Sequence, residues 1–338
     1  MGACCNLKCQ PKDETPYKSP LLLSNYHLKS LRKLQAHIKG HLYRRYIITN
    51  KHCPFSFDIH SHSQKVEQLY KSLGPYFNPS HIPVLTNPRS HEWKQFIILE
   101  GKLTYQGYWH TRKQTKDGYG IQLWDDGSLY EGYFRDNKAH GPGRLIHSDG
   151  DVYDGNWVSD KAHGFGKYSH WDGSVYVGEW KDDKQCGCGY EVWPDGSKYV
   201  GNYLEGSKNG VGEFTWEDGS TYNGEFVKNS IKGKGTYKWK DGRMYQGEWD
   251  NNKMEGKGVF TWVDGRRFKG EYVNDKKQGK GIFEWPDGKR YEGDWFNGRQ
   301  HGIGYMTTKS GKVQKGEYRN GEKMKIIEEM ESENVNDT

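Results

Sequence analysis

The segment GVGEFTWEDGSTYNGEF, residues 210–226, decides the fold. On each side of Asp218-Gly219, small or aromatic residues alternate with polar ones, and this is the period of a β-strand. An Asp-Gly pair between two such runs marks a hairpin. The segment therefore predicts two antiparallel strands joined by a tight turn.

The length of the turn follows from the positions of the rings. A two-residue turn at Asp218-Gly219 would place Phe214 and Tyr222 on opposite faces. A three-residue turn, Glu217–Gly219, pairs Phe214 with Tyr222 and Gly212 with Gly224, so the rings share one face. Gly219 then takes the left-handed position of a type I turn with a G1 bulge. We expect this register, in which a ring covers the strand glycines opposite or diagonal to it.

The same pattern recurs along the chain. The glycine of a Tyr-x-Gly frame returns at 107, 132, 155, 178, 201, 224, 247, 270, 293 and, with Gln314 in the tyrosine position, 316. The first interval is 25 residues and every later one is 23. A fixed period in this range indicates an array of one supersecondary unit. As repeat core we expect Tyr130, Trp157, Tyr176, Trp180, Tyr222, Phe226, Tyr245, Trp249, Tyr291 and Trp295.

One copy reads YQGEW at residues 245–249, followed by GKG at 256–258 and WVDG at 262–265. This pattern resembles the MORN (membrane occupation and recognition nexus) repeat, and the resemblance covers residues 96–318. It implies an all-β repeat array: an elongated single-layer antiparallel sheet of about ten hairpins over 96–321, preceded by a helical or irregular N-terminal segment. Proteins of this family serve as scaffolds, form dimers and associate with membranes, so the resemblance implies a non-enzymatic scaffold.

The 338-residue chain has 33% hydrophobic residues and a mean hydropathy of −1.05, and no stretch is apolar enough for a transmembrane helix.

The residues themselves also argue against catalysis. No nucleophile–base pair or carboxylate dyad follows from spacing, and Cys186-x-Cys188 lacks a second pair of ligands for zinc. Interleaved acidic residues break the continuous basic groove that single-stranded nucleic acid requires. We expect no cofactor, no metal and no nucleic-acid partner.

The N-terminus carries a possible lipidation signal. Residues 1–95 hold 14 basic and 5 acidic residues, which favours an acidic partner or an anionic membrane. In MGACC, Gly2 is positioned for N-myristoylation, and Cys4 and Cys5 suit palmitoylation, although Asn6 stands where the usual signal has Ser or Thr. We expect an acylated segment over 1–23, at the cytoplasmic face of a plasma or ciliary membrane or at the cell cortex. The alternative is an ordinary N-terminus with incidental thiols.

Residues 24–48 predict an amphipathic helix, because apolar residues recur every three to four positions. The segment resembles the calmodulin-binding IQ motif at Leu34, Gln35, Lys39, Gly40, Arg44 and Ile47. The resemblance implies calmodulin or a related EF-hand protein as partner, with apolar anchors in a groove and cations at its acidic rim. Two alternatives remain open: the helix caps the first hairpin, or it lies on a membrane surface.

The remaining segments are predicted from composition. Residues 49–95 are expected to form a proline-rich linker with a short helix around 66–73, and 322–338 a short helix and polar tail. We expect a membrane-anchored scaffold whose partners are cytoplasmic or cytoskeletal proteins, calmodulin and a second copy of the chain. One alternative is a phosphoinositide-binding module, favoured by the cluster Lys232, Lys234, Lys238, Lys240, Arg266, Arg267, Lys276, Lys277 and Lys280. Another is a regulatory subunit of a separate enzyme.

Overall fold

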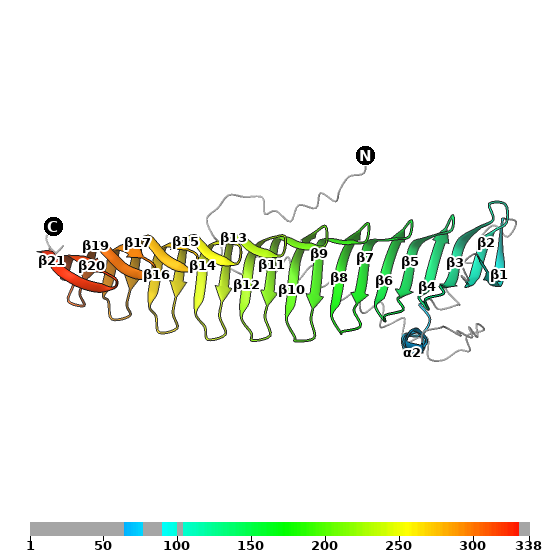
Figure 1. Cartoon of the computed structure of the whole chain (residues 1–338), viewed down its shortest axis with the longest axis horizontal. Helices are drawn as coiled ribbons and strands as arrows, with labels where there is room; N and C mark the ends of the chain where they lie inside the picture. Colours follow the sequence, from blue (N-terminus) through cyan, green and yellow to red (C-terminus); the bar gives the residue numbers. More distant parts are fainter. Residues whose placement is uncertain (1–63, 77–89, 100–103, 331–338) are drawn as a thin grey trace, which may run out of the picture. The chain divides into compact units, whose positions relative to one another are not determined.

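The computed structural model describes residues 64–76, 90–99 and 104–330. These residues form one helix and 21 strands (Figure 1). They divide into two compact units. Among the described residues, unit 1 comprises those up to Pro194 together with Tyr203–Gly206. Unit 2 comprises Asp195–Asn202 and the described residues from Ser207 onward. The segments predicted at 1–23 and 24–48 lie outside the described residues.

Unit 1 is a single antiparallel layer in which each strand from β1 to β9 pairs with the next one in the chain. Helix α2 (Gln64–Leu73) precedes the strands. The strands are β1 (His91–Ile98), β2 (Thr104–His110), β3 (Thr115–Leu123), β4 (Leu129–Arg135), β5 (Lys138–Ile146), β6 (Val152–Val158), β7 (Lys161–Ser169), β8 (Val175–Lys181) and β9 (Lys184–Val192).

Unit 2 repeats this arrangement from β11 to β21, again with each strand paired to the next. Strand β10 (Lys198–Leu204) contributes residues to both units. The others are β11 (Ser207–Thr215), β12 (Thr221–Val227), β13 (Ser230–Lys238), β14 (Met244–Asp250), β15 (Lys253–Thr261), β16 (Arg267–Val273), β17 (Lys276–Glu284), β18 (Arg290–Phe296), β19 (Arg299–Thr307), β20 (Val313–Arg319) and β21 (Glu322–Met330). The predicted array of hairpins in a single antiparallel layer is confirmed in each unit.

The predicted register of the hairpin is also confirmed. Phe214 pairs with Tyr222, Gly212 with Gly224 and Gly210 with Phe226. Gly219 has a φ of 87°, and its N–H donates to the Trp216 carbonyl at 3.0 Å, as a three-residue turn with a left-handed glycine requires. The rings of the two strands therefore share one side of the sheet, called the ring face below.

The segments between hairpins are tight turns as well, which the sequence had left as unspecified loops. From β4 onward, two residues with positive φ join each even-numbered strand to the next, for example Asn251 (46°) and Asn252 (65°). Asn and Asp tolerate this conformation better than most residues, and the resulting turn matches the twist of the paired strands. The longer first interval lies in the β2–β3 turn, where Gln114 N–H bonds to the His110 carbonyl at 2.8 Å.

The core of each unit is a row of rings laid over paired glycines. Gly247 faces Gly258 across β14 and β15, and the ring of Tyr245 crosses both. Its hydroxyl donates to the carbonyl of Glu248 at 3.0 Å. Trp249 donates through Nε1 to the Gly235 carbonyl at 3.3 Å and meets Tyr245 edge to face at 5.1 Å. Glycine is needed here because any Cβ would occupy the volume of the ring.

Helix α2 covers the opposite face of unit 1. Val66 is fully buried against Ile121, Leu129, Ile146 and Val152. These four residues point away from the ring face because they alternate with ring-face residues along their strands.

The segment after α2 is held by polar contacts. Tyr76 N–H donates to Glu131 Oε2 at 2.9 Å, and Arg144 donates to the Gly74 carbonyl at 2.9 Å and to Asp154 Oδ1 at 2.5 Å. The buried Glu131 and Arg144 are thus both satisfied. The helix and its turn are an integral part of unit 1.

The ends of the array differ from the prediction in two places. The sheet begins at His91 rather than residue 96, because β1 pairs with β2 ahead of the first repeat. The predicted C-terminal helix is wrong: Glu322–Met330 is strand β21, paired along β20 from Arg319 to Val313. The open edge of β20 supplies hydrogen-bond partners that outweigh the helix propensity of this Glu-, Lys- and Met-rich segment.

Candidate binding surface

The ten aromatic residues predicted to form the repeat core are all buried. Their exposed fractions run from 0% for Tyr222, Tyr245 and Tyr291 to 8% for Trp180. Tyr222 contacts Phe226 of its own strand at 5.2 Å and Trp249 of the next repeat at 5.6 Å, both edge to face. These rings hold the sheet together, and they present almost no surface to the solvent.

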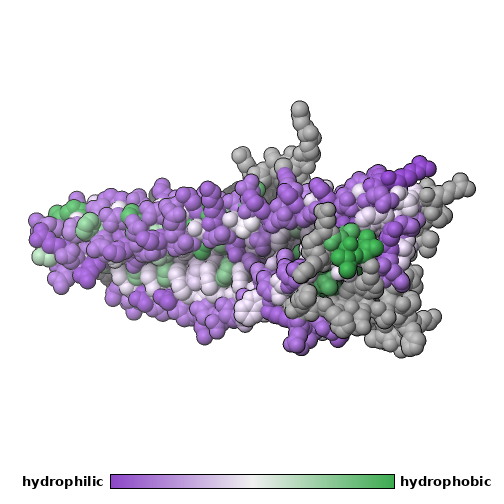
Figure 2. Space-filling view, turned by 45° about the vertical axis from the view of Figure 1, so that its right-hand side comes forward, coloured by the Kyte–Doolittle hydropathy of each residue, from purple (hydrophilic) through white to green (hydrophobic). Residues whose placement is uncertain are grey.

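A second row of rings in unit 2 lies nearer the solvent. It alternates the ring of the Gly-x-Gly strand with the tryptophan that precedes the Asp-Gly turn, and we call it the ring ladder: Phe214, Trp216, Tyr237, Trp239, Phe260, Trp262, Phe283 and Trp285. Neighbouring rings follow one another at centroid distances between 4.4 and 5.4 Å. All but Phe260 and Phe283 are half-buried. The face of the molecule seen in Figure 2 is mostly hydrophilic, with a pale band of intermediate hydropathy between purple margins.

Two arginines of unit 2 lie against the ring ladder. The Arg243 guanidinium lies 5.4 Å from the Trp239 ring, and that of Arg266 lies 5.6 Å from Trp262. Each also binds the aspartate of its own turn, Asp241 and Asp264, at 2.7 Å. The positive charge of these side chains is therefore largely neutralised within the turn.

A third set of residues recurs every 23 positions, but the residue type changes from repeat to repeat. These residues pair across the strands with the Trp-position rings, for example Ile231 with Phe226 and Met254 with Trp249. We call them the floor column: Lys116, Ala139, Ala162, Gln185, Lys208, Ile231, Met254, Lys277, Gln300 and Lys323. The sequence analysis missed this column, because a search for repeats selects the positions that stay the same.

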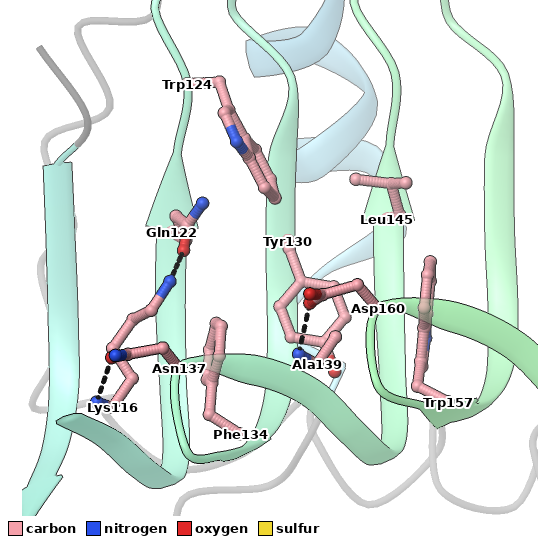
Figure 3. A pocket seen from close by; sticks show the side chains of 10 residues that line it. All are labelled: Lys116, Gln122, Trp124, Tyr130, Phe134, Asn137, Ala139, Leu145, Trp157 and Asp160. Carbon is pink, nitrogen blue, oxygen red and sulfur yellow. Dashed lines mark hydrogen bonds between the residues drawn. The ribbon is translucent and has the colours of Figure 1, made fainter. Parts of the chain in front are cut away.

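In unit 1 the alanines of the floor column leave space between rings. A hollow of about 300 Å³ is lined by Tyr130, Phe134 and Trp157, with Ala139 between them (Figure 3). Asp160 lies at its edge and accepts a hydrogen bond from Ala139 N at 2.7 Å. This bond joins adjacent turns, and the equivalent bond from Lys116 N to Asn137 Oδ1 measures 2.8 Å, so Asp160 has a structural role.

Lys116 closes one end of the hollow. Its ammonium lies 4.8 Å from the centre of the Phe134 ring and donates to Gln122 Oε1. Burial lowers the pKa of Lys116 to about 8, with Asp160 opposing the shift. In this repeat the buried charge has an acceptor on its own strand, six residues further on.

The other predicted sites are not tested by the structure. Gly2, Cys4, Cys5 and the IQ-like residues Leu34, Gln35, Lys39, Gly40, Arg44 and Ile47 lie outside the described residues. Within the described ranges no group of His, Cys, Asp and Glu is arranged to hold a metal ion. In the same ranges no helix is both long and apolar enough to cross a membrane.

Comparison with known families identifies the repeats. A family model described as the MORN repeat matches eight segments: 130–152, 153–175, 176–198, 199–221, 222–242, 245–266, 268–290 and 291–313. Together these segments make up more than half of the 338 residues. The chain belongs to the MORN-repeat family. MORN repeats are protein- and membrane-binding modules, are associated with membrane-proximal proteins and are not known as enzymes.

No curated protein matches this MORN-repeat chain. Among solved structures it is similar to the TCP10 domain of Danio rerio CPAP in complex with a peptide of Danio rerio STIL, with 14% identity and a TM-score of 0.40. That match covers 72% of this chain and 100% of the other. A mutant of the same Danio rerio domain has 11% identity and a TM-score of 0.26, covering 71% and 100%.

Proposed function

We propose that the protein is a non-enzymatic scaffold that binds a protein segment along the ring ladder of unit 2. The observation that carries this proposal is the continuous row of ladder rings, six of the eight half-buried, beside the buried ring row. Rings in such a position lose water-exposed apolar area when a chain packs on them, and Trp and Tyr are the residues that contribute most at protein interfaces.

The test compares two substitutions on opposite faces of the same unit. Trp262→Ser removes the centre of the ladder, and Val259→Ser removes an apolar side chain from the other face of β15. We expect a purified partner to lose about 10-fold or more in affinity with Trp262→Ser and to bind Val259→Ser like wild type. Equal binding by all three proteins would reject the ladder as the docking surface.

A phosphoinositide headgroup is the second candidate, and the cations of the later repeats motivate it. Arg243 and Arg266 are paired with aspartates, and Lys280 binds Asp294 at 2.6 Å. We therefore place this candidate second. Sedimentation of the unacylated full chain with vesicles containing phosphatidylinositol 4,5-bisphosphate tests it. Salt-sensitive binding by wild type and by Trp262→Ser alike would favour the lipid.

We further propose that Gly2, Cys4 and Cys5 carry acyl chains that hold the scaffold at the cytoplasmic face of a membrane. One myristoyl chain binds only marginally, so a second chain or the basic segment behind it is needed. In cell fractionation, Gly2→Ala should move the protein from the membrane to the soluble fraction. Unchanged partitioning would discard the anchor.

Residues 34–47 are proposed to bind calmodulin or a related EF-hand protein. The motif at Gln35 and Arg44, the basic charge and the helical spacing of apolar residues support this proposal. The double variant Gln35→Ala, Arg44→Ala should recover less purified calmodulin in a pull-down than wild type, and equal recovery would leave the helix as a cap of the sheet or a membrane-surface helix.

A further inference from the structure

Lys277, a member of the floor column, has its ammonium close to four aromatic rings. Its ammonium lies 4.7 Å from the centre of the Phe283 ring, 4.8 Å from Trp295, 4.9 Å from Trp262 and 5.0 Å from Phe268. Burial, with a smaller contribution from Arg266, lowers the pKa of Lys277 to about 8. The side chain is still mostly charged at neutral pH.

This charge has no acceptor in the part of the chain that the structure describes, where Lys277 Nζ makes no hydrogen bond or ion pair. Lys116 shows the contrast, because its ammonium donates a hydrogen bond to Gln122 Oε1, six residues further along the strand. The equivalent residue for Lys277 is Phe283, which offers only its ring. Ring faces attract a cation, but they do not replace a charged hydrogen-bond acceptor.

The fold does not need a charge at this position. The preceding repeats place Ile231 and Met254 there, and the next repeat places Gln300. Lys277 therefore carries a partly buried ammonium that the fold does not require. Such a group is better explained by ligand binding than by packing.

We propose that Lys277 is the anchoring subsite for an acidic side chain of the segment that binds the ring ladder. The inference rests on the proposed docking function and specifies its partner: a peptide in which Glu or Asp is flanked by apolar or aromatic residues. The carboxylate meets the Lys277 ammonium, and its apolar neighbours cover Trp262 and Trp239.

The test uses a random dodecapeptide library displayed on phage and selected on the purified full chain. Enriched peptides are synthesised with their acidic residue and with the matching amide, and calorimetry measures the affinity of both. Four proteins are compared: wild type, Lys277→Met, Trp262→Ser and the control Lys276→Met. Methionine is tolerated by the fold at this position, as Met254 shows, and Lys276 is the exposed neighbour pointing to the other face.

The amide peptide should bind wild type and Lys276→Met about 10- to 100-fold more weakly than the acidic peptide, as expected for one charge-assisted hydrogen bond. Against Lys277→Met the two peptides should differ less than about 2-fold, within the usual error of additivity. Peptides that need Trp262 but show the same acid preference with Lys277→Met overturn the subsite and leave docking intact. A selection that yields no Trp262-dependent peptide rejects both.

Discussion

The packing of Tyr245 over Gly247 gives a sharp prediction for Gly247→Ala. A Cβ at Gly247 would lie 2.5 Å from the Tyr245 hydroxyl, 2.6 Å from Gly258 Cα and 2.7 Å from the Lys257 carbonyl oxygen. Contacts this short force the ring to leave its place and the two strands to separate. Overpacking of this kind costs about 1–3 kcal/mol. Loss of the bond from Tyr245 to the Glu248 carbonyl adds about 1 kcal/mol.

The gain from replacing glycine in a strand offsets about 0.5–1 kcal/mol. We therefore expect Gly247→Ala to lower the free energy of unfolding by about 1–3.5 kcal/mol. The chain contains its own control, because Gln314 replaces the tyrosine beside Gly316. A Cβ at Gly316 would meet Lys325 O at 3.0 Å and Tyr318 Cε2 at 3.4 Å, so Gly316→Ala should change stability by less than about 1 kcal/mol.

Urea unfolding followed by tryptophan fluorescence measures both variants. Repeat arrays can open locally, so hydrogen exchange of the amides in β14 and β15 shows where the loss occurs. If Gly247→Ala lowered the free energy of unfolding no more than Gly316→Ala, the Tyr245 ring would not require glycine at position 247. The account of the repeat core would then be wrong.

Three further perturbations test other parts of the fold. Burial raises the pKa of Tyr245 well above its usual value near 10, so the neutral phenol stabilises the folded state below pH 10, and this stabilisation is lost as pH rises further. Circular dichroism should show that Tyr245→Phe unfolds less readily than wild type between about pH 10 and 11.5. Val66→Ala should remove about 2 kcal/mol from the docking of α2 and speed hydrogen exchange of the helix, whereas the exposed Gln68→Ala should leave both unchanged. Asn252→Ala should lose about 1–2 kcal/mol in urea unfolding, because Oδ1 accepts from Ile231 N at 2.8 Å and φ is 65°; Asn252→Gly should lose less, since it keeps the φ.

The repeating part of the structure could be predicted because its constraints are local. The parity of Phe214 and Tyr222 around Asp218-Gly219 leaves one turn length that keeps the rings together, and the structure has that turn. The C-terminal segment could not be predicted in this way. Glu322–Met330 consists largely of good helix formers, and its strand conformation depends on the open edge of β20. Local propensity contains no information about such an edge.

The candidate surface was less accessible to sequence reasoning. The tyrosines and tryptophans of the Tyr-x-Gly-x-Trp frame are the strongest signal in the sequence, yet they are buried. The partly exposed rings sit beside them on the same strands, and alternation alone does not tell the two rows apart. The four rings around Lys277 come from four strands or turns, so their distances depend on the twist of the sheet.

The repeat itself restricts where specificity can arise. The frame tyrosines cover two glycines each, Trp157, Trp180, Trp249 and Trp295 donate to glycine carbonyls, and the Asp-Gly turns set the register. Changing any of them damages the sheet. The floor column is different, since the chain itself places Ala, Gln, Ile, Met and Lys at this position. A residue that varies without disturbing the fold and lies between rings can alter recognition alone. We therefore expect selectivity to follow the floor column, with Lys277 as the charged member that contacts Trp262 and Phe283 of the ring ladder.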